Sequence, residues 1–307
     1  MAEKTPNQQL AEKLLFKPAY VGDKSAAVKQ EAHAFAEGYK KFLDAGKTER
    51  EVAAESEQML KDAGYQQFDP KKTYAPGDKV YFSQLGKAIV ASTIGTRSFE
   101  DGFHLVIAHT DSPRLDLRPT PLYESDHLSY FKTHYYGGIR KYQWGTIPLS
   151  IHGVFTREDG STVTVRVGED ENDPVFCITD LLPHLGAEQG ERKLSDGIRA
   201  EELNILIGSD AVDDEEVKEA VKLNTMILLN EKYGITEKDF ARAEIEIVPA
   251  YKSRDVGFDR SMIGAYGHDD RVDAYPALMA EIATKNPAFT TVCVLTDKEE
   301  IGSDGVT

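Results

Sequence analysis

The chain has 307 residues, of which 40% are hydrophobic and 29% charged, as is typical of a folded globular protein with room for two domains. Its formal net charge of -16 argues against sequence-independent binding to nucleic acid and against binding to anionic membranes. Residues 1–10 lack a signal-peptide pattern, and no apolar run is long enough to cross a bilayer. The two cysteines, Cys177 and Cys293, are too few for a disulfide framework. We therefore expect a cytoplasmic protein.

Helical patterns dominate from about residue 8 to residue 62. Residues 26–43 carry an amphipathic stripe, and Thr48-Glu49-Arg50-Glu51 has the form of a capping box that begins another helix. Residues 80–82 and 87–94 are then predicted as strands, and the apolar run 103–108 as a central strand. Helices alternating with strands predict an α/β layer.

The pattern changes after Pro113. Short alternating segments such as residues 147–155 and 161–167, separated by Gly and Asp, predict a mostly antiparallel β region. This region also contains a predicted loop at residues 186–202 and a predicted helix at residues 214–233. Because α/β character returns near Asp269, we predict a catalytic α/β domain, residues 1–113 and 263–307, and an inserted β-rich domain, residues 114–262.

Three apolar segments end in side chains that bind metals well. These side chains are His109 and Asp111 after residues 103–108, Asp269 after residues 263–267, and Glu299 and Glu300 after residues 291–296. Ligand crevices in open α/β sheets lie at the carboxyl ends of strands, where buried carboxylates need a compensating charge. We therefore expect the three segments to meet around metal ions.

Each side chain fits a role in such a centre. Asp111 could accept the second ring N–H of His109 and so orient it. Asp269 could bridge two ions about 3.5–4 Å apart, with Glu300 on the second ion. Glu299 could act as general base on a metal-bound water.

Each motif also has a simpler interpretation. His-x-Asp is often a cap or a surface pair, Asp-Asp-Arg is often an N-cap with a salt bridge, and Glu-Glu is often a solvated face. The presence of all three motifs at the ends of apolar segments favours the metal centre.

Three stretches carry a resemblance to a known family. Residues 107–113 (Ile-Ala-His-Thr-Asp-Ser-Pro), 267–272 (Gly-His-Asp-Asp-Arg-Val) and 297–303 (Asp-Lys-Glu-Glu-Ile-Gly-Ser) together resemble the aspartyl aminopeptidases, which include vacuolar aminopeptidase I. Residues 136–138, 183–185 and 202–209 add supporting matches, and the resemblance runs from about residue 10 to the end.

The resemblance implies a co-catalytic dinuclear zinc peptidase, in which Co²⁺ or Mn²⁺ can replace Zn²⁺. It makes His109 a terminal ligand oriented by Asp111, Asp269 the bridging ligand, Glu300 a terminal ligand and Glu299 the general base. The implied fold is a zinc-peptidase α/β/α domain with an inserted β domain that serves dimerisation and larger assembly. A further implied role is that His184 reaches a neighbouring subunit's active site.

Two departures from the family pattern affect these expectations. The family supplies a further carboxylate ligand and a histidine ligand beyond its Glu-Glu motif, whereas this chain stops at Thr307. The resemblance therefore implies a fragment or, if the chain is complete, an inactive assembly subunit. Residues 143–148 also differ from the Asp-Arg-Asp stretch of members that prefer acidic residues, which leaves the preferred N-terminal residue open between acidic and neutral.

The function expected from the sequence is a metal-dependent aminopeptidase that removes the N-terminal residue of peptides. Its expected partners are peptide substrates and further copies of itself. The alternatives are a related dinuclear zinc hydrolase, such as a carboxypeptidase or deacylase, and a non-catalytic assembly subunit.

Overall fold

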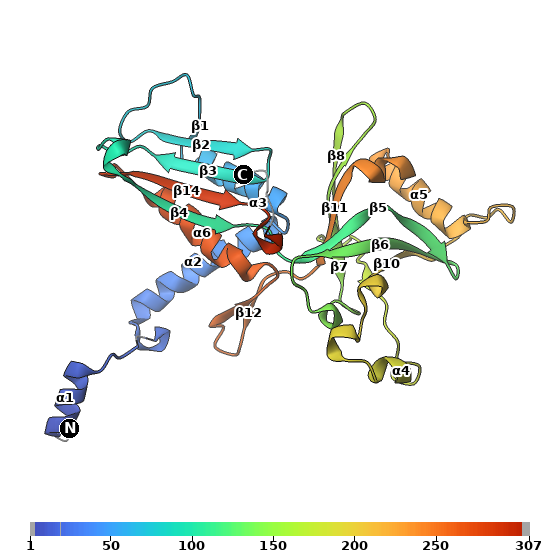
Figure 1. The fold of residues 1–307 in the computed structure, drawn as a ribbon, viewed down its shortest axis with the longest axis horizontal. Coiled ribbons are helices and arrows are strands. Elements are labelled where there is room, and N and C mark those ends of the chain that lie inside the picture. Colours follow the sequence, from blue (N-terminus) through green and yellow to red (C-terminus); the bar gives the residue numbers. More distant parts are fainter. Residues whose placement is uncertain (1–3, 19, 303–307) are drawn as a thin grey trace. The chain divides into compact units, whose positions relative to one another are not determined.

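The computed structural model describes residues 4–18 and 20–302, in two compact units that divide after Tyr39. The first unit contains α1 (Pro6–Leu14), η1 (Val21–Asp23) and the start of α2 (Ala26–Ala45) (Figure 1). The predicted helical region is therefore interrupted after Leu14, because Pro18 disfavours helical geometry in the residue before it. Every helix within residues 4–18 and 20–302 is too short or too polar to cross a lipid bilayer.

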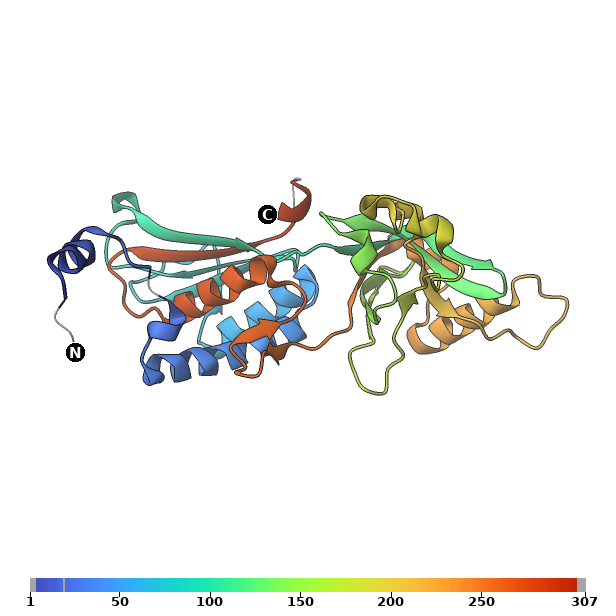
Figure 2. The same cartoon turned by 90° about the horizontal axis from the view of Figure 1, so that it is seen from below.

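The second unit contains a five-stranded sheet. In spatial order its strands are β1 (Gln66–Gln67), β2 (Lys79–Gln84), β3 (Ala88–Thr93), β14 (Thr290–Thr296) and β4 (Phe103–His109). Helices α3 (Glu49–Asp62) and α6 (His268–Ala283) cover one face of this sheet (Figure 2). Strands β14 and β4 run parallel, with Thr296 paired to His109, so their carboxyl ends lie side by side.

The position of β4 differs from the prediction. Among the described strands β4 lies at the edge of the sheet, not at its centre. Four of its apolar side chains are 44–59% exposed, namely Phe103, Leu105, Val106 and Ile107. A run of apolar residues indicates that a strand suits burial on both faces, but strand order depends on long-range pairing that the run does not encode.

The predicted capping box at Thr48 is confirmed. The Thr48 hydroxyl accepts the Glu51 N–H at 3.3 Å, and the Glu51 carboxylate accepts the Thr48 N–H at 3.2 Å. These bonds satisfy backbone donors that have no partner within the first turn of α3.

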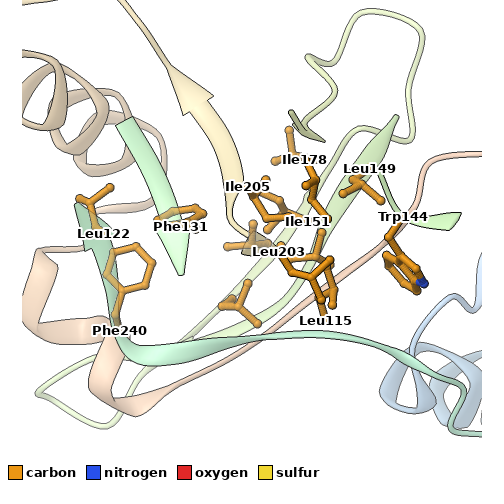
Figure 3. Packing of buried hydrophobic residues seen from close by; sticks show 14 of the residues in the cluster. Leu115, Leu122, Phe131, Trp144, Leu149, Ile151, Ile178, Leu203, Ile205 and Phe240 are labelled. Atoms are coloured by element: carbon orange, nitrogen blue, oxygen red, sulfur yellow. The ribbon is translucent and has the colours of Figure 1, made fainter. Parts of the chain in front are cut away.

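A seven-stranded sheet occupies the central part of the sequence, and all its neighbouring strands are antiparallel. In spatial order its strands are β8 (Thr162–Val167), β7 (Leu149–Thr156), β11 (Ala243–Pro249), β5 (Arg114–Ser125), β6 (Leu128–Tyr136), β10 (Ile205–Gly208) and β9 (Cys177–Ile178). Its side chains and those of the segments packed on it form a buried cluster that includes Leu115, Ile151 and, from outside the strands, Phe240 (Figure 3). The predicted antiparallel character is confirmed. Because residues 40–307 form one compact unit, the domain boundaries near residues 113 and 263 stay a prediction.

Helix α5 (Ala220–Tyr233) begins six residues later than the predicted start at Asp214. Its first backbone N–H groups need acceptors, and the Glu124 carboxylate of β5 accepts those of Val221 and Lys222 at 3.0 and 2.9 Å. The acidic run 213–216 lies outside the helix.

Short helical turns fill most of the remaining connections. The predicted loop 186–202 contains three of them, α4 (Ala187–Gly190), η4 (Leu194–Asp196) and η5 (Ala200–Glu202). The others are η2 (Phe99–Asp101), η3 (Lys141–Gln143), η6 (Glu237–Arg242) and η7 (Glu299–Ile301), and a hairpin pairs β12 (Arg254–Val256) with β13 (Met262–Gly264).

A buried histidine joins α3 to the seven-stranded sheet. His152 on β7 contacts the Glu51 carboxylate through Nδ1 at 2.8 Å and Glu169 through Nε2 at 3.1 Å. Burial alone would lower the pKa of His152, but hydrogen bonds and charge from Glu169 and Glu51 outweigh burial and raise it. Lys47 also pairs with Glu169 at 2.9 Å, so the contact is a network of ions.

Replacing this histidine should change how stability depends on pH. A raised folded-state pKa stabilises the protein fully below about pH 6.5, and the contribution is lost as pH rises through the folded value. We expect His152→Gln to lower the free energy of unfolding by roughly 1.5–3 kcal/mol near pH 6 and by less above pH 9. Urea unfolding at both pH values measures this difference. The exposed His134→Gln is the control, and an equal loss at both pH values for His152→Gln would contradict the ionic role.

Candidate metal centre

Three segments distant in sequence meet at the carboxyl ends of β4 and β14. His109 ends β4, Asp269 lies at the start of α6, and Glu300 lies in η7, which begins three residues after the end of β14. One ligand atom from each of these residues lies within 4.8 Å of the others. An imidazole nitrogen and two carboxylates are ligands that zinc commonly binds in proteins.

The orientation of His109 is determined by Asp111. Nδ1 of His109 lies 3.1 Å from the Asp111 backbone oxygen and 3.3 Å from its Oδ1. Nε2 faces the other way, 3.4 Å from Asp269 Oδ1 and 3.5 Å from Glu299 Oε2. Burial alone would lower the pKa of His109, but hydrogen bonds and charge from Asp111 outweigh it and raise the pKa to about 9. The ring therefore presents Nε2 to the carboxylates, as a metal ligand would.

Asp111 is fully buried and accepts hydrogen bonds from several donors. The Tyr136 hydroxyl donates to its Oδ2 at 2.6 Å, and the backbone N–H groups of Glu299 and Glu300 donate at 3.3 and 3.2 Å. Burial alone would raise the pKa of Asp111, but the donors His109, Tyr136 and Glu300 lower it to about 2. Asp111 therefore stays ionised and connects the His109 segment to the turn that carries Glu300.

The start of α6 is anchored to the residues after β4. Asp269 and Asp270 have non-helical backbone angles, and the Ser112 hydroxyl donates to the Asp269 carbonyl at 3.0 Å. Fully buried Arg271 donates to the Thr110 carbonyl at 3.1 Å. The α6 N-cap is Gly267, which has no side chain that could accept a cap hydrogen bond.

Gly267 has a positive φ of 82°, and an added Cβ would lie 2.4 Å from Nη1 of Arg271. Glycine is therefore required where α6 begins, because Arg271 fills the space beside the backbone.

The three carboxylates that face the centre, those of Asp269, Glu299 and Glu300, differ in exposure. The Asp269 and Glu299 side chains are 85% and 65% exposed, whereas Glu300 is half-buried. Burial raises the pKa of Glu300, and the carboxylates of Asp111, Asp269 and Glu299 add to the rise against the attraction of His109. A carboxylate that is partly buried among others is stabilised by a bound cation.

All five residues predicted for the site lie together. His109, Asp269 and Glu300 form the candidate ligand group, Glu299 faces His109 Nε2, and Asp111 lies behind the imidazole. Their individual roles stay predictions. A second acidic cluster, formed by Glu49, Glu244 and Glu246, contacts Lys87 and Arg114, so it is an ion-pair network.

Sequence reasoning did not single out two residues near this centre. Tyr136 appeared only as part of a supporting match, although its place at the end of a strand beside two glycines was a usable signal. Asp297 is buried at the end of β14, and neither of its oxygens accepts a hydrogen bond within the described chain. Burial, followed by repulsion from Glu49, raises the pKa of Asp297 to about 6.

Comparison with known proteins connects this geometry to a family. Residues 42–307 match the family model "Aminopeptidase I zinc metalloprotease (M18)". The chain is 49% identical over 282 residues to a probable M18 family aminopeptidase 1 of Clostridium acetobutylicum, covering 91% of this chain and 61% of that protein. The chain thus spans about three fifths of the length of this relative.

Solved structures agree with the match. The crystal structure of an M18 aminopeptidase from Thermotoga maritima superimposes with a TM-score of 0.88 at 44% identity, covering 94% of this chain and 63% of that one. Aminopeptidase I from Clostridium acetobutylicum gives a TM-score of 0.88 at 44% identity, covering 96% and 66%. Both the predicted fold class and the predicted family are confirmed. The chain belongs to the M18 family, the aminopeptidase I zinc metalloproteases.

Proposed function

We propose that this chain carries the metal centre of an aminopeptidase that removes the N-terminal residue of peptides. The observation that carries the proposal is the convergence of His109, Asp269 and Glu300, with Glu299 beside them, in a member of a zinc metalloprotease family. His109 would hold one zinc ion, Glu300 the other, and Asp269 would bridge them. A carboxylate suits the bridging role because its two oxygens can bind two ions about 3.5–4 Å apart.

The chemistry follows from what each side chain can do. Bound zinc would polarise the scissile carbonyl and make an attacking water more acidic. Glu299 would accept a proton from a water held there and would pass it to the leaving amine, a role that needs a carboxylate within hydrogen-bond reach. Asp111 holds the His109 ring in place through Nδ1, leaving Nε2 for the metal.

The proposal is tested by combining activity with metal content. Purified at full length, the protein should bind zinc and cleave aminoacyl chromogenic substrates, and chelation should abolish both properties until zinc or cobalt is restored. Cleavage of N-acylated substrates instead would favour the related carboxypeptidase or deacylase. A folded chain that binds no metal would favour the assembly-subunit alternative.

Self-association is proposed for the inserted region, residues 114–262. Exposed leucines follow β9, at positions 181, 182 and 185, next to exposed His184. Contiguous exposed apolar side chains often mark protein interfaces. The solved structure of mApe1 from S. cerevisiae is a dodecamer; its resemblance to this chain, at 17% identity and a TM-score of 0.67, concerns the fold. Sedimentation of the purified chain tests the proposal.

The contact of His184 with a neighbouring subunit's active site stays a prediction. The cytoplasmic location also stays a prediction.

A further inference from the structure

One side chain of the seven-stranded sheet reaches the candidate metal centre. Tyr136 is the last residue of β6, and its hydroxyl donates to Asp111 Oδ2 at 2.6 Å. Its side chain is only 5% exposed, whereas the preceding Tyr135 is 47% exposed. The alternation of a strand explains this difference, because successive side chains point to opposite faces.

The Tyr136 ring is itself held in place by Arg114. The two residues pair across β5 and β6, and the guanidinium carbon of Arg114 lies 3.8 Å from the ring centroid. Arg114 in turn contacts three carboxylates, those of Glu49 at 3.3 Å, Asp116 at 2.8 Å and Glu246 at 3.1 Å. A guanidinium fixed on several sides provides a rigid surface against which the phenol ring packs.

Tyr136 therefore donates a hydrogen bond to a carboxylate that contacts two of the segments carrying candidate ligands. Asp111 contacts the His109 ring, and it also accepts the backbone N–H groups of Glu299 and Glu300. If the phenol is absent, Oδ2 loses its shortest hydrogen bond in a fully buried position, and the carboxylate can rotate. Rotation would loosen His109 and the turn carrying Glu300 together.

We propose that Tyr136 is a positioning residue of the metal centre, which fixes Asp111 so that His109 and Glu300 both face the centre. The inference rests on the proposed metal-binding function. It also makes the seven-stranded sheet part of the site, because the residue behind the ligands comes from β6 and not from the sheet that carries them.

The matched pair Tyr136→Phe and Tyr135→Phe tests the proposal. Each variant removes one phenol oxygen and keeps the ring, so both should fold. We expect Tyr136→Phe to weaken zinc binding about 10–100-fold, as is usual when a residue behind a ligand is lost. With Co²⁺ in place of zinc, its visible absorption spectrum should also shift, because the ligand geometry changes. Tyr135→Phe should match the unmodified chain in both measurements.

A second variant tests the surface against which the Tyr136 ring packs. Arg114→Lys keeps the positive charge but loses the flat surface under the ring, so it should weaken zinc binding by less than Tyr136→Phe does. Unchanged zinc affinity and an unchanged Co²⁺ spectrum in Tyr136→Phe would overturn the proposal while leaving the metal centre intact. If the unmodified chain binds no zinc, the proposed function and this inference both fail. If Glu300→Ala loses zinc and Tyr136→Phe does not, the result supports the metal centre and rules out the positioning role of Tyr136.

Discussion

Glu299→Gln is expected to retain zinc and to lose turnover by about 10²–10⁴-fold, the usual contribution of a positioned general base. Glutamine has nearly the shape of glutamate, but its amide cannot accept a proton at neutral pH. The Glu299 carboxylate is largely exposed and lies 3.5 Å from His109 Nε2, so it is open to a water on the metal side of the ring. The measurements are kcat on an aminoacyl substrate and zinc content per chain.

The control for this result is a variant that shortens the same side chain. Glu299→Asp keeps a carboxylate at the wrong distance, so it should retain more turnover than Glu299→Gln, with zinc content unchanged. If Glu299→Gln keeps a large fraction of its activity, Glu299 is not the base. If it loses zinc, Glu299 is a ligand.

Glu300→Ala is expected to lower zinc affinity by more than about 100-fold, which is the upper end of the effect seen when a residue behind a ligand is removed. The half-buried Glu300 carboxylate lies among those of Asp111, Asp269 and Glu299, whose repulsion a bound cation would relieve. Removing Glu300 takes away a ligand and part of the negative charge that attracts the ion. Isothermal titration with zinc measures the loss directly.

Comparing Glu299→Gln with Glu300→Ala distinguishes the role of general base from that of metal ligand. Excess zinc should restore part of the activity of Glu300→Ala but none of the activity of Glu299→Gln. The same response to zinc in both variants would contradict the division of roles between base and ligand.

The seven-stranded sheet also contacts the candidate site directly. Tyr136 links it to Asp111, and Arg114 links it to Glu49 of α3. A change within this sheet can therefore reach the candidate ligands through the buried contact between Tyr136 and Asp111. The His152 and Tyr136 variants examine two different contacts of this kind, one at the junction with α3 and one at the metal centre.

Local patterns in the sequence were enough to predict the candidate ligands, because each follows an apolar segment that forms a strand or hairpin. His109, Asp269 and Glu300 were found in this way, and the capping box at Thr48 was found from four consecutive residues. Hydrogen bonds between residues three or four apart and side-chain alternation depend on short stretches of chain, so they can be read before the fold is known.

Contacts between distant residues were decided by the pairing of strands and the packing of sheets. Tyr136 meets Asp111 across 25 positions, and Glu124 determines where α5 begins across 97 positions. The edge position of β4 likewise follows from strand order, which its apolar residues do not encode. Such contacts depend on the register and order of whole sheets, which the local pattern of one strand does not encode.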